Sequence, residues 1–131
     1  MTACVESPTM PCMSPRSRVL IVDDHDGFRA VARALLERDG FMVVAEAADG
    51  AGALVEAARV SPDLVLLDVH LPDVDGFEVS RWLSMLPSPP AVVLTSSRPI
   101  ADLRNRVSES PAAGFVAKDR LSGAALTALA G

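Results

Sequence analysis

The sequence of 131 residues has no uninterrupted apolar stretch that is long enough to cross a membrane, since such a helix needs about 18 apolar residues or more. The first residues also contain no continuous apolar segment of the kind that directs secretion. Half of all residues (50%) are nevertheless hydrophobic, which indicates a folded rather than a disordered chain. We therefore expect one compact cytoplasmic domain with its own core and no membrane contact.

Positive charge, cysteine and histidine are all scarce. The chain has 12 basic and 17 acidic residues, a net charge of −5, and only two residues each of cysteine and histidine. Phosphate backbones repel an acidic surface, so we expect no direct nucleic-acid binding by this chain. Cys4 and Cys12 both lie near the N-terminus and are too few for a zinc site with four ligands. We interpret them as incidental residues of a tail.

The beginning of the chain differs from the rest. Pro8, Pro11 and Pro15 lie there among Ser, Thr and Met, and the apolar residues show no periodicity. This pattern predicts a disordered N-terminal tail over residues 1–17 and a folded domain over residues 18–131. Met13 is an alternative start within that tail.

From Arg18 onward, short apolar runs alternate with segments whose apolar residues recur at helical spacing. The runs are predicted to be strands: Arg18–Val22, residues 42–46, residues 64–67, residues 91–94 and Gly114–Ala117. Helices are predicted from Phe28 to the stop at Asp39-Gly40, over residues 49–60, over residues 76–86, from Pro99 onward, and after a Ser122 cap with Leu121 and Leu126 as its hydrophobic staple.

Apolar spacing also predicts which helix residues face the sheet. The inward residues expected are Leu54, Ala57 and Ala58 in the second helix, Val79, Leu83 and Leu86 in the third, and Ile100, Leu103 and Val107 in the fourth. Strict alternation of strands and helices implies an α/β fold, a doubly wound five-stranded parallel sheet with helices on both faces.

The residues that close four of the predicted strands carry charged or hydroxyl side chains. In strand order they are Asp23 and Asp24, Asp68, Thr95 and Ser96, and Lys118. In an open parallel sheet, ligands bind beyond the carboxyl ends of the strands, where the strand order reverses. We therefore expect three carboxylates, hydroxyls and an ammonium group to converge on one rim.

Crowded carboxylates repel one another unless a cation lies among them, and Mg²⁺ prefers oxygen ligands. Asp68 is a competent nucleophile toward phosphorus, while Mg²⁺, Lys118 and the Thr95 hydroxyl would stabilise the oxygens of a transferring phosphoryl group. Each residue alone also fits a turn, a helix cap or the surface, but their joint placement predicts a phosphoryl-acceptor site. His25 and His70 fit loop positions better than metal-ligand positions on such an oxygen-rich rim.

Five ordered segments carry a more specific signal: Val19-Leu-Ile-Val-Asp23-Asp24-His25, Pro62-Asp-Leu-Val-Leu-Leu-Asp68, Leu71-Pro72-Asp-Val-Asp75-Gly76, Val92-Val-Leu-Thr95 and Gly114-Phe115-Val-Ala-Lys118. In this order and spacing they resemble the response-regulator receiver domains of bacterial two-component systems. The resemblance covers Arg18 to about Leu129. It implies a flavodoxin-like receiver fold with strand order 2-1-3-4-5, and a signalling switch rather than an enzyme.

The same resemblance implies roles for individual residues. Asp68 would accept a phosphoryl group from a sensor histidine kinase or a phosphotransfer protein. Asp23, Asp24, Asp68 and the main-chain carbonyl of His70 would hold Mg²⁺.

Thr95 and Phe115 match the coupled switch pair of the family. Their movement would remodel the face made by helix four, strand five and helix five. That face would bind a downstream protein partner or form a phosphorylation-dependent homodimer.

Asp23-Asp24-His25 and Lys118-Asp119 further resemble the receivers that accompany LuxR-type helix-turn-helix outputs. Because the chain ends at Gly131, it is expected to be either a stand-alone receiver or one whose output domain is absent. A phosphorylation-independent interaction module is a second hypothesis, against which the full acidic set argues. A third is an aspartyl-phosphate hydrolase, although His70 stands where such enzymes typically carry a second acid and no cap domain is visible.

Overall fold

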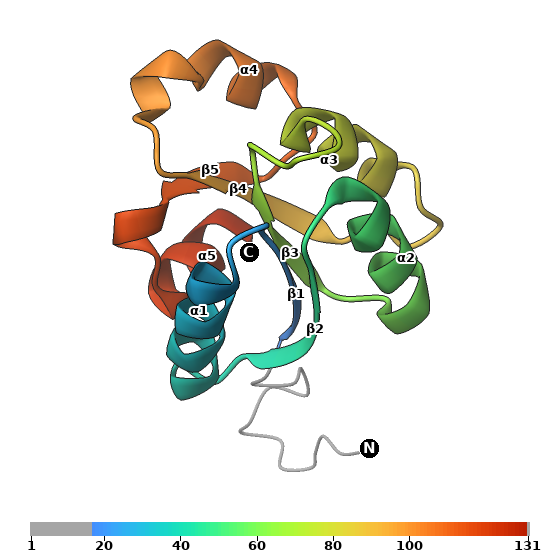
Figure 1. Ribbon diagram of the computed structural model, residues 1–131, viewed down its shortest axis with the longest axis vertical. Coiled ribbons are helices and arrows are strands. Elements are labelled where there is room, and N and C mark those ends of the chain that lie inside the picture. Colours follow the sequence, from blue (N-terminus) through green and yellow to red (C-terminus); the bar gives the residue numbers. More distant parts are fainter. Residues whose placement is uncertain (1–16, 131) are drawn as a thin grey trace, which may run out of the picture.

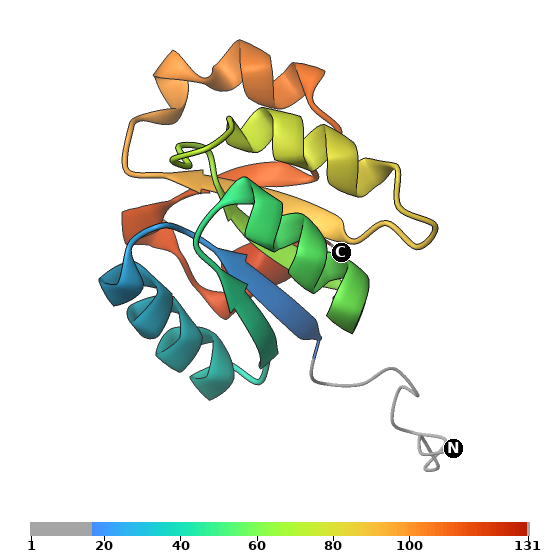
Figure 2. The same cartoon turned by 45° about the vertical axis from the view of Figure 1, so that its right-hand side comes forward.

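A parallel sheet between two layers of helices makes up the part of the chain that the computed structural model describes, residues 17–130 (Figures 1 and 2). The predicted tail lies outside the described residues, except for Ser17. The elements are, in chain order, β1 (Arg18–Val22), α1 (Asp26–Arg38), β2 (Met42–Ala47), α2 (Gly50–Val60), β3 (Leu64–Asp68), α3 (Gly76–Ser84), β4 (Ala91–Ser96), a 3₁₀ turn (Ile100–Asp102), α4 (Arg104–Glu109), β5 (Gly114–Ala117), a second 3₁₀ turn (Lys118–Arg120) and α5 (Gly123–Ala130).

The five strands are all parallel and lie in the order β2-β1-β3-β4-β5, which confirms the predicted fold class and strand order. From β1 the chain first continues outward to β2, and it then returns to add β3 on the other side of β1. The carboxyl ends of β1 and β3 therefore lie together at the point where the strand order reverses. In open α/β sheets this is the place where ligands bind.

Two apolar cores cover the two faces of the sheet. Alternate residues of the central strands divide between them: Val22 and Leu67 belong to the core beneath α2 and α3, whereas Ile21 and Leu66 belong to the core beneath α1 and α5. Every residue of β3 is buried. A central parallel strand is covered on both faces, which is why its sequence is continuously apolar rather than alternating.

Side-chain caps fix where three of the helices begin. Asp49 accepts a hydrogen bond from the N–H of Gly52 at the start of α2, and Asp75 accepts one from the N–H of Phe77 at the start of α3. The Ser122 hydroxyl accepts one from the N–H of Ala125, so the predicted cap of α5 is confirmed. These bonds satisfy main-chain donors that have no partner within the helix.

Three predictions about the helices are wrong. Ala58 is exposed, because α2 faces the sheet through Ala53 and Ala57 instead. The fourth helical segment begins as a 3₁₀ turn and becomes α-helical only at Arg104. A 3₁₀ turn has three residues per turn rather than 3.6, so Ile100 rotates outward and is 38% exposed.

The third predicted helix also ends earlier than expected, since α3 stops at Ser84. Pro87 accounts for this, because a proline disfavours helical conformation in the residue before it. Leu86 still packs partly against the core beneath α3.

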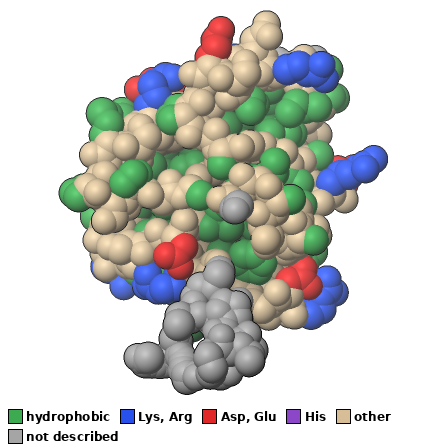
Figure 3. Space-filling model, turned by 180° about the vertical axis from the view of Figure 1, so that it is seen from behind, with side chains coloured by type: hydrophobic (Ala, Val, Ile, Leu, Met, Phe, Trp, Pro, Cys, Tyr) green, Lys and Arg blue, Asp and Glu red, His purple; other side chains and the backbone are tan. Residues whose placement is uncertain are grey.

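The surface behind the view of Figure 1 is rich in hydrophobic side chains, and most of the charged ones lie at its margins (Figure 3). Helix α5 carries no charged residue over Gly123–Ala130. Among the described residues, no helix combines the length and apolar character that a membrane crossing requires.

We predict opposite effects for two glycine-to-alanine substitutions. A Cβ at Gly76 would lie 2.4 Å from the main-chain oxygen of Asp68, so Gly76→Ala forces α3 away from β3 and lowers the free energy of unfolding by about 1–3 kcal/mol. Gly27 lies in α1 with nothing within 4 Å of such a Cβ. Gly27→Ala is the matched control and raises stability by up to about 1 kcal/mol. Urea denaturation measures both, and equal effects would contradict the close approach of α3 to β3.

We also predict that Ser80→Ala does not destabilise the domain. The Ser80 hydroxyl is buried in α3 and has no hydrogen-bond partner among the described residues. Removing an unsatisfied buried polar group leaves stability unchanged or raises it by up to about 1 kcal/mol. A clear fall in the urea midpoint of Ser80→Ala would show that the hydroxyl has a partner.

Candidate functional site

The residues predicted to converge do meet at one end of the sheet. Asp23 directly follows β1, Asp68 ends β3 and Lys118 follows β5. Asp68 pairs in register with Thr95 of the neighbouring strand β4, and the N–H of Val69 donates to the Thr95 carbonyl at 2.9 Å. The sheet thus fixes these positions through its own hydrogen bonds, without help from a flexible loop.

Lys118 connects the two buried carboxylates of this site. Its Nζ lies 2.7 Å from Oδ2 of Asp23 and 3.5 Å from Oδ2 of Asp68. The same Nζ lies 4.5 Å from the centroid of the Phe28 ring in α1, a cation–π contact. The approach to Asp23 is an ion pair without hydrogen-bond geometry, since Asp23 Oδ2 makes no hydrogen bond within the described residues. Lys118 is the only lysine of the chain.

The main chain of Asp23 is held from two sides. Its N–H donates to the carbonyl of Ala47 in β2 at 3.0 Å, and its carbonyl accepts a hydrogen bond from the Arg29 guanidinium. Arg29 also pairs with Glu46 of β2 at 3.0 Å. These contacts anchor the connection between β1 and α1. They therefore hold in place the main chain that carries the Asp23 carboxylate.

Asp68 has an unusual environment for a carboxylate, because the residue is only 3% exposed. Burial raises the pKa of Asp68 above its ordinary value, and the negative charge of Asp23 raises it further. The hydrogen bond from the N–H of His70 to Oδ1, at 3.1 Å, and the nearby Lys118 ammonium act in the opposite direction. A positive charge placed among these groups therefore favours the ionised carboxylate.

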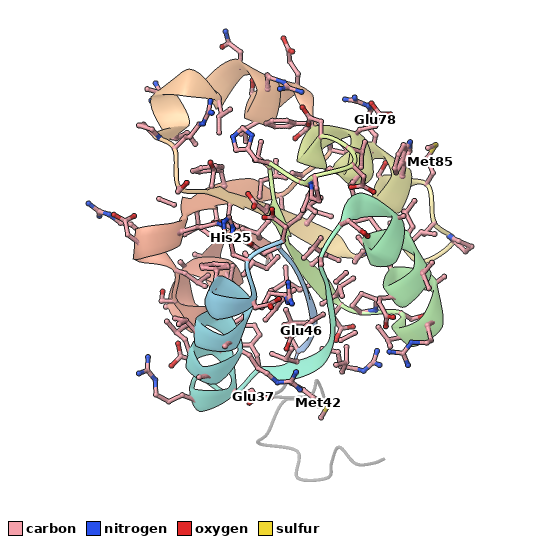
Figure 4. All side chains as sticks on the ribbon, viewed as in Figure 1. His25, Glu37, Met42, Glu46, Glu78 and Met85 are labelled. Atoms are coloured by element: carbon pink, nitrogen blue, oxygen red, sulfur yellow. The ribbon has the colours of Figure 1, made fainter. Side chains whose placement is uncertain are left out.

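Four side chains offer potential metal ligands that all lie within 4.8 Å of one another: Asp23, Asp24, His25 and Asp68. The three carboxylates are those predicted from the sequence. His25 lies in the loop between β1 and α1, as predicted (Figure 4), and its Nδ1 lies 3.3 Å from Oδ1 of Asp23 and 3.2 Å from Oδ1 of Asp24. The only signal in the sequence was that His25 directly follows the two aspartates.

His70 makes a contact with Asp68 that the sequence analysis did not predict. Its N–H orients Asp68, as described above. The metal-binding role of its carbonyl stays a prediction. Its side chain is exposed.

Thr95 contributes a hydroxyl that lacks a partner. The residue is fully buried, and Oγ1 makes no hydrogen bond within the described residues. Buried hydroxyls are normally satisfied, so this one leaves a hydrogen-bond donor available in the residue that pairs with Asp68. Three carboxylates and a free hydroxyl form an oxygen-rich set, which fits Mg²⁺ and a phosphoryl group.

Two aspartates that sequence reasoning assigned to no role hold the loop between β3 and α3. Asp73 accepts hydrogen bonds from the N–H groups of Gly50 and Ala51 at the start of α2, at 2.8 and 3.0 Å. The bond from Gly50 is the largest influence on Asp73 and lowers its pKa. Asp75 pairs with Arg106 of α4 at 2.6 Å. In the sequence, the only indication of a role for these two aspartates was their place in the segment Asp73-Val-Asp75-Gly76.

Phe115 lies in β5 beside the site, opposite Leu94 in the register of β4 and β5. Its side chain is half-buried and packs against the core beneath α3. The predicted switch of Phe115 with Thr95 would require a second conformation of the protein. That role stays a prediction.

Comparison with known proteins agrees with this geometry. A putative transcriptional regulator of Pseudomonas aeruginosa is 47% identical over 103 residues, which are 78% of this chain and 49% of that protein. This chain thus spans about half the length of that relative. The signal receiver domain of the putative response regulator NarL from Mycobacterium tuberculosis superposes with a TM-score of 0.78 at 34% identity, covering 88% of this chain and 98% of that one.

A two-component response regulator of the LuxR family from an Aurantimonas species has a TM-score of 0.73 at 32% identity, covering 79% of this chain and 74% of that one. This likeness agrees with the resemblance to LuxR-type receivers seen in the sequence. Residues 19–129 also match the family model described as the response regulator receiver domain. The chain therefore belongs to the response regulator receiver domain family.

Proposed function

We propose that this chain is a phosphorylation switch in which Asp68 accepts a phosphoryl group from a sensor histidine kinase or a phosphotransfer protein. Phosphorylation by a histidine kinase is the general function of the family. One observation carries the proposal for this chain: the buried carboxylate of Asp68 lies 3.5 Å from the Lys118 ammonium and pairs in strand register with Thr95, whose buried hydroxyl has no hydrogen-bond partner among the described residues. Such an arrangement lowers stability unless another group joins it.

Asp23, Asp24, Asp68 and the main-chain carbonyl of His70 are the residues that we propose to hold Mg²⁺. When bound, this ion neutralises the carboxylates and the charge on the transferring phosphoryl oxygens. The supporting observation is the clustering of the three carboxylates within 4.8 Å. Oδ2 of Asp23 adds to it, because this buried atom has an ion pair with Lys118 but no hydrogen-bond partner among the described residues.

The chain's own residues divide the chemistry among them. A carboxylate oxygen of Asp68 attacks phosphorus, the bond from phosphorus to the donor imidazole breaks, and the departing imidazole takes up a proton from water. The Lys118 ammonium binds one phosphoryl oxygen. The Thr95 hydroxyl donates a hydrogen bond to another. Both groups stabilise charge that increases during the transfer.

We propose that phosphorylation is then transmitted through Thr95 and Phe115. A hydrogen bond from Thr95 to the phosphoryl group would draw β4 toward the site and let the half-buried Phe115 ring turn inward. The face formed by α4, β5 and α5 would change as a result. We propose that a downstream protein, or a second copy of this chain, binds there. The cytoplasmic location stays a prediction.

We predict that incubation with acetyl phosphate and Mg²⁺ adds one phosphoryl group to the protein and that Asp68→Asn abolishes the addition. Intact-protein mass spectrometry measures the added mass, and peptide mapping locates it. The matched control is Asp63→Asn, because Asp63 precedes the other end of β3 and should leave the modification unchanged. An unmodified wild-type protein would contradict the proposed function.

We further predict that Thr95→Val slows phosphorylation without lowering the stability of the fold. The valine fills nearly the same volume, and the hydroxyl that it removes has no partner in this state. The free energy of unfolding should therefore stay constant or rise. The rate of phosphorylation should fall about 10- to 100-fold, since a hydrogen bond to a charged group contributes about 1.5–3 kcal/mol. Equal phosphorylation rates for Thr95→Val and wild type would contradict the role of the hydroxyl.

A further inference from the structure

We propose that His25 adds a nitrogen ligand to the carboxylate cluster, so that this site also binds divalent transition-metal ions such as Ni²⁺ and Co²⁺. The inference rests on the proposed function, because it uses the same carboxylates. It goes beyond that function in the class of ion that the site accepts. Carboxylates and water suit Mg²⁺, whereas an imidazole favours transition metals.

The distances around His25 support this proposal. Its Nδ1 lies 3.2 Å from Oδ1 of Asp24 and 3.3 Å from Oδ1 of Asp23. Ligand atoms that bind one transition-metal ion at about 2.0–2.2 Å lie about 3.0–3.4 Å from each other. The imidazole nitrogen therefore already lies at the separation of neighbouring ligands from each of the two carboxylate oxygens.

A local hydrogen bond keeps the main chain of His25 beside the cluster. The N–H of His25 donates to Oδ1 of Asp23 at 2.8 Å, which ties its main chain to one of the carboxylates. His25 is the N-cap residue of α1, but its side chain makes no capping hydrogen bond. Within the described residues, the polar contacts recorded for the ring are those with Asp23 and Asp24.

A second observation points to a ligand at the same cluster. Oδ2 of Asp23 is buried and has no hydrogen-bond partner among the described residues. The single ammonium of Lys118 lies close to both Asp23 and Asp68, so the three carboxylates carry more negative charge than it balances. The side chain of His25 is 72% exposed, which leaves water to complete the coordination of an ion.

The test compares two metals on two proteins by isothermal titration calorimetry. The proteins are the chain without a polyhistidine tag and its His25→Gln variant, both with Cys4→Ser and Cys12→Ser, because thiolates also bind soft metals. The titrations use Ni²⁺ and Mg²⁺ at about pH 8. Co²⁺ absorption spectra provide an independent readout, since a nitrogen ligand changes the d–d bands.

We expect His25→Gln to weaken Ni²⁺ binding about 10- to 100-fold, the loss of one coordinate bond worth about 1.4–2.8 kcal/mol, and to change Mg²⁺ affinity less than about twofold. The Co²⁺ bands should shift in the variant. Unchanged Ni²⁺ affinity beside intact Mg²⁺ binding would overturn this inference alone. Tighter binding of both ions by His25→Gln would also overturn it, because the imidazole would then hinder ion binding instead of contributing a ligand. Wild-type protein that binds neither ion would overturn the proposed function as well.

Discussion

The ion pairs of Lys118 with Asp23 and Asp68 are the interactions on which the candidate site depends. Two carboxylates are buried within reach of one ammonium group, and burial of a charge is costly unless an opposite charge offsets it. Lys118 also joins β5 to β1 and β3 across the intervening strand β4. Lys118 therefore offsets part of the negative charge of the two carboxylates. It also links the strand ends that carry them to the end of β5.

The sheet determines how the remaining groups are arranged around this pair. Asp68 and Thr95 lie on neighbouring strands in register, so strand pairing brings these two residues together. The loop after β3 is tied to α2 by Asp73 and to α4 by Asp75. Rigid strands thus supply the reactive groups, while the surrounding helices hold the loop that orients Asp68.

The sequence was sufficient for most of the fold and for the predicted set of converging residues. Continuous apolar runs define central parallel strands, and residues at the carboxyl ends of such strands share one rim, so Asp23, Asp68 and Lys118 were predictable. Ile100 was not, because a 3₁₀ turn and an α-helix place the same apolar residues on different faces. The His25 ring contacts the carboxylates of Asp23 and Asp24, and the main-chain N–H of His25 also donates to Asp23. Sequence spacing does not encode that contact.

The central claim is that these buried carboxylates bind a divalent cation. The free energy of unfolding, measured as a function of Mg²⁺ concentration, tests this claim most directly. Urea unfolding at constant ionic strength yields the free energy of unfolding at each Mg²⁺ concentration. An ion that binds only the folded state raises this free energy by about 1.4 kcal/mol for each tenfold increase in its concentration above the Kd. The account predicts that rise, and a free energy of unfolding that does not change with Mg²⁺ would contradict it.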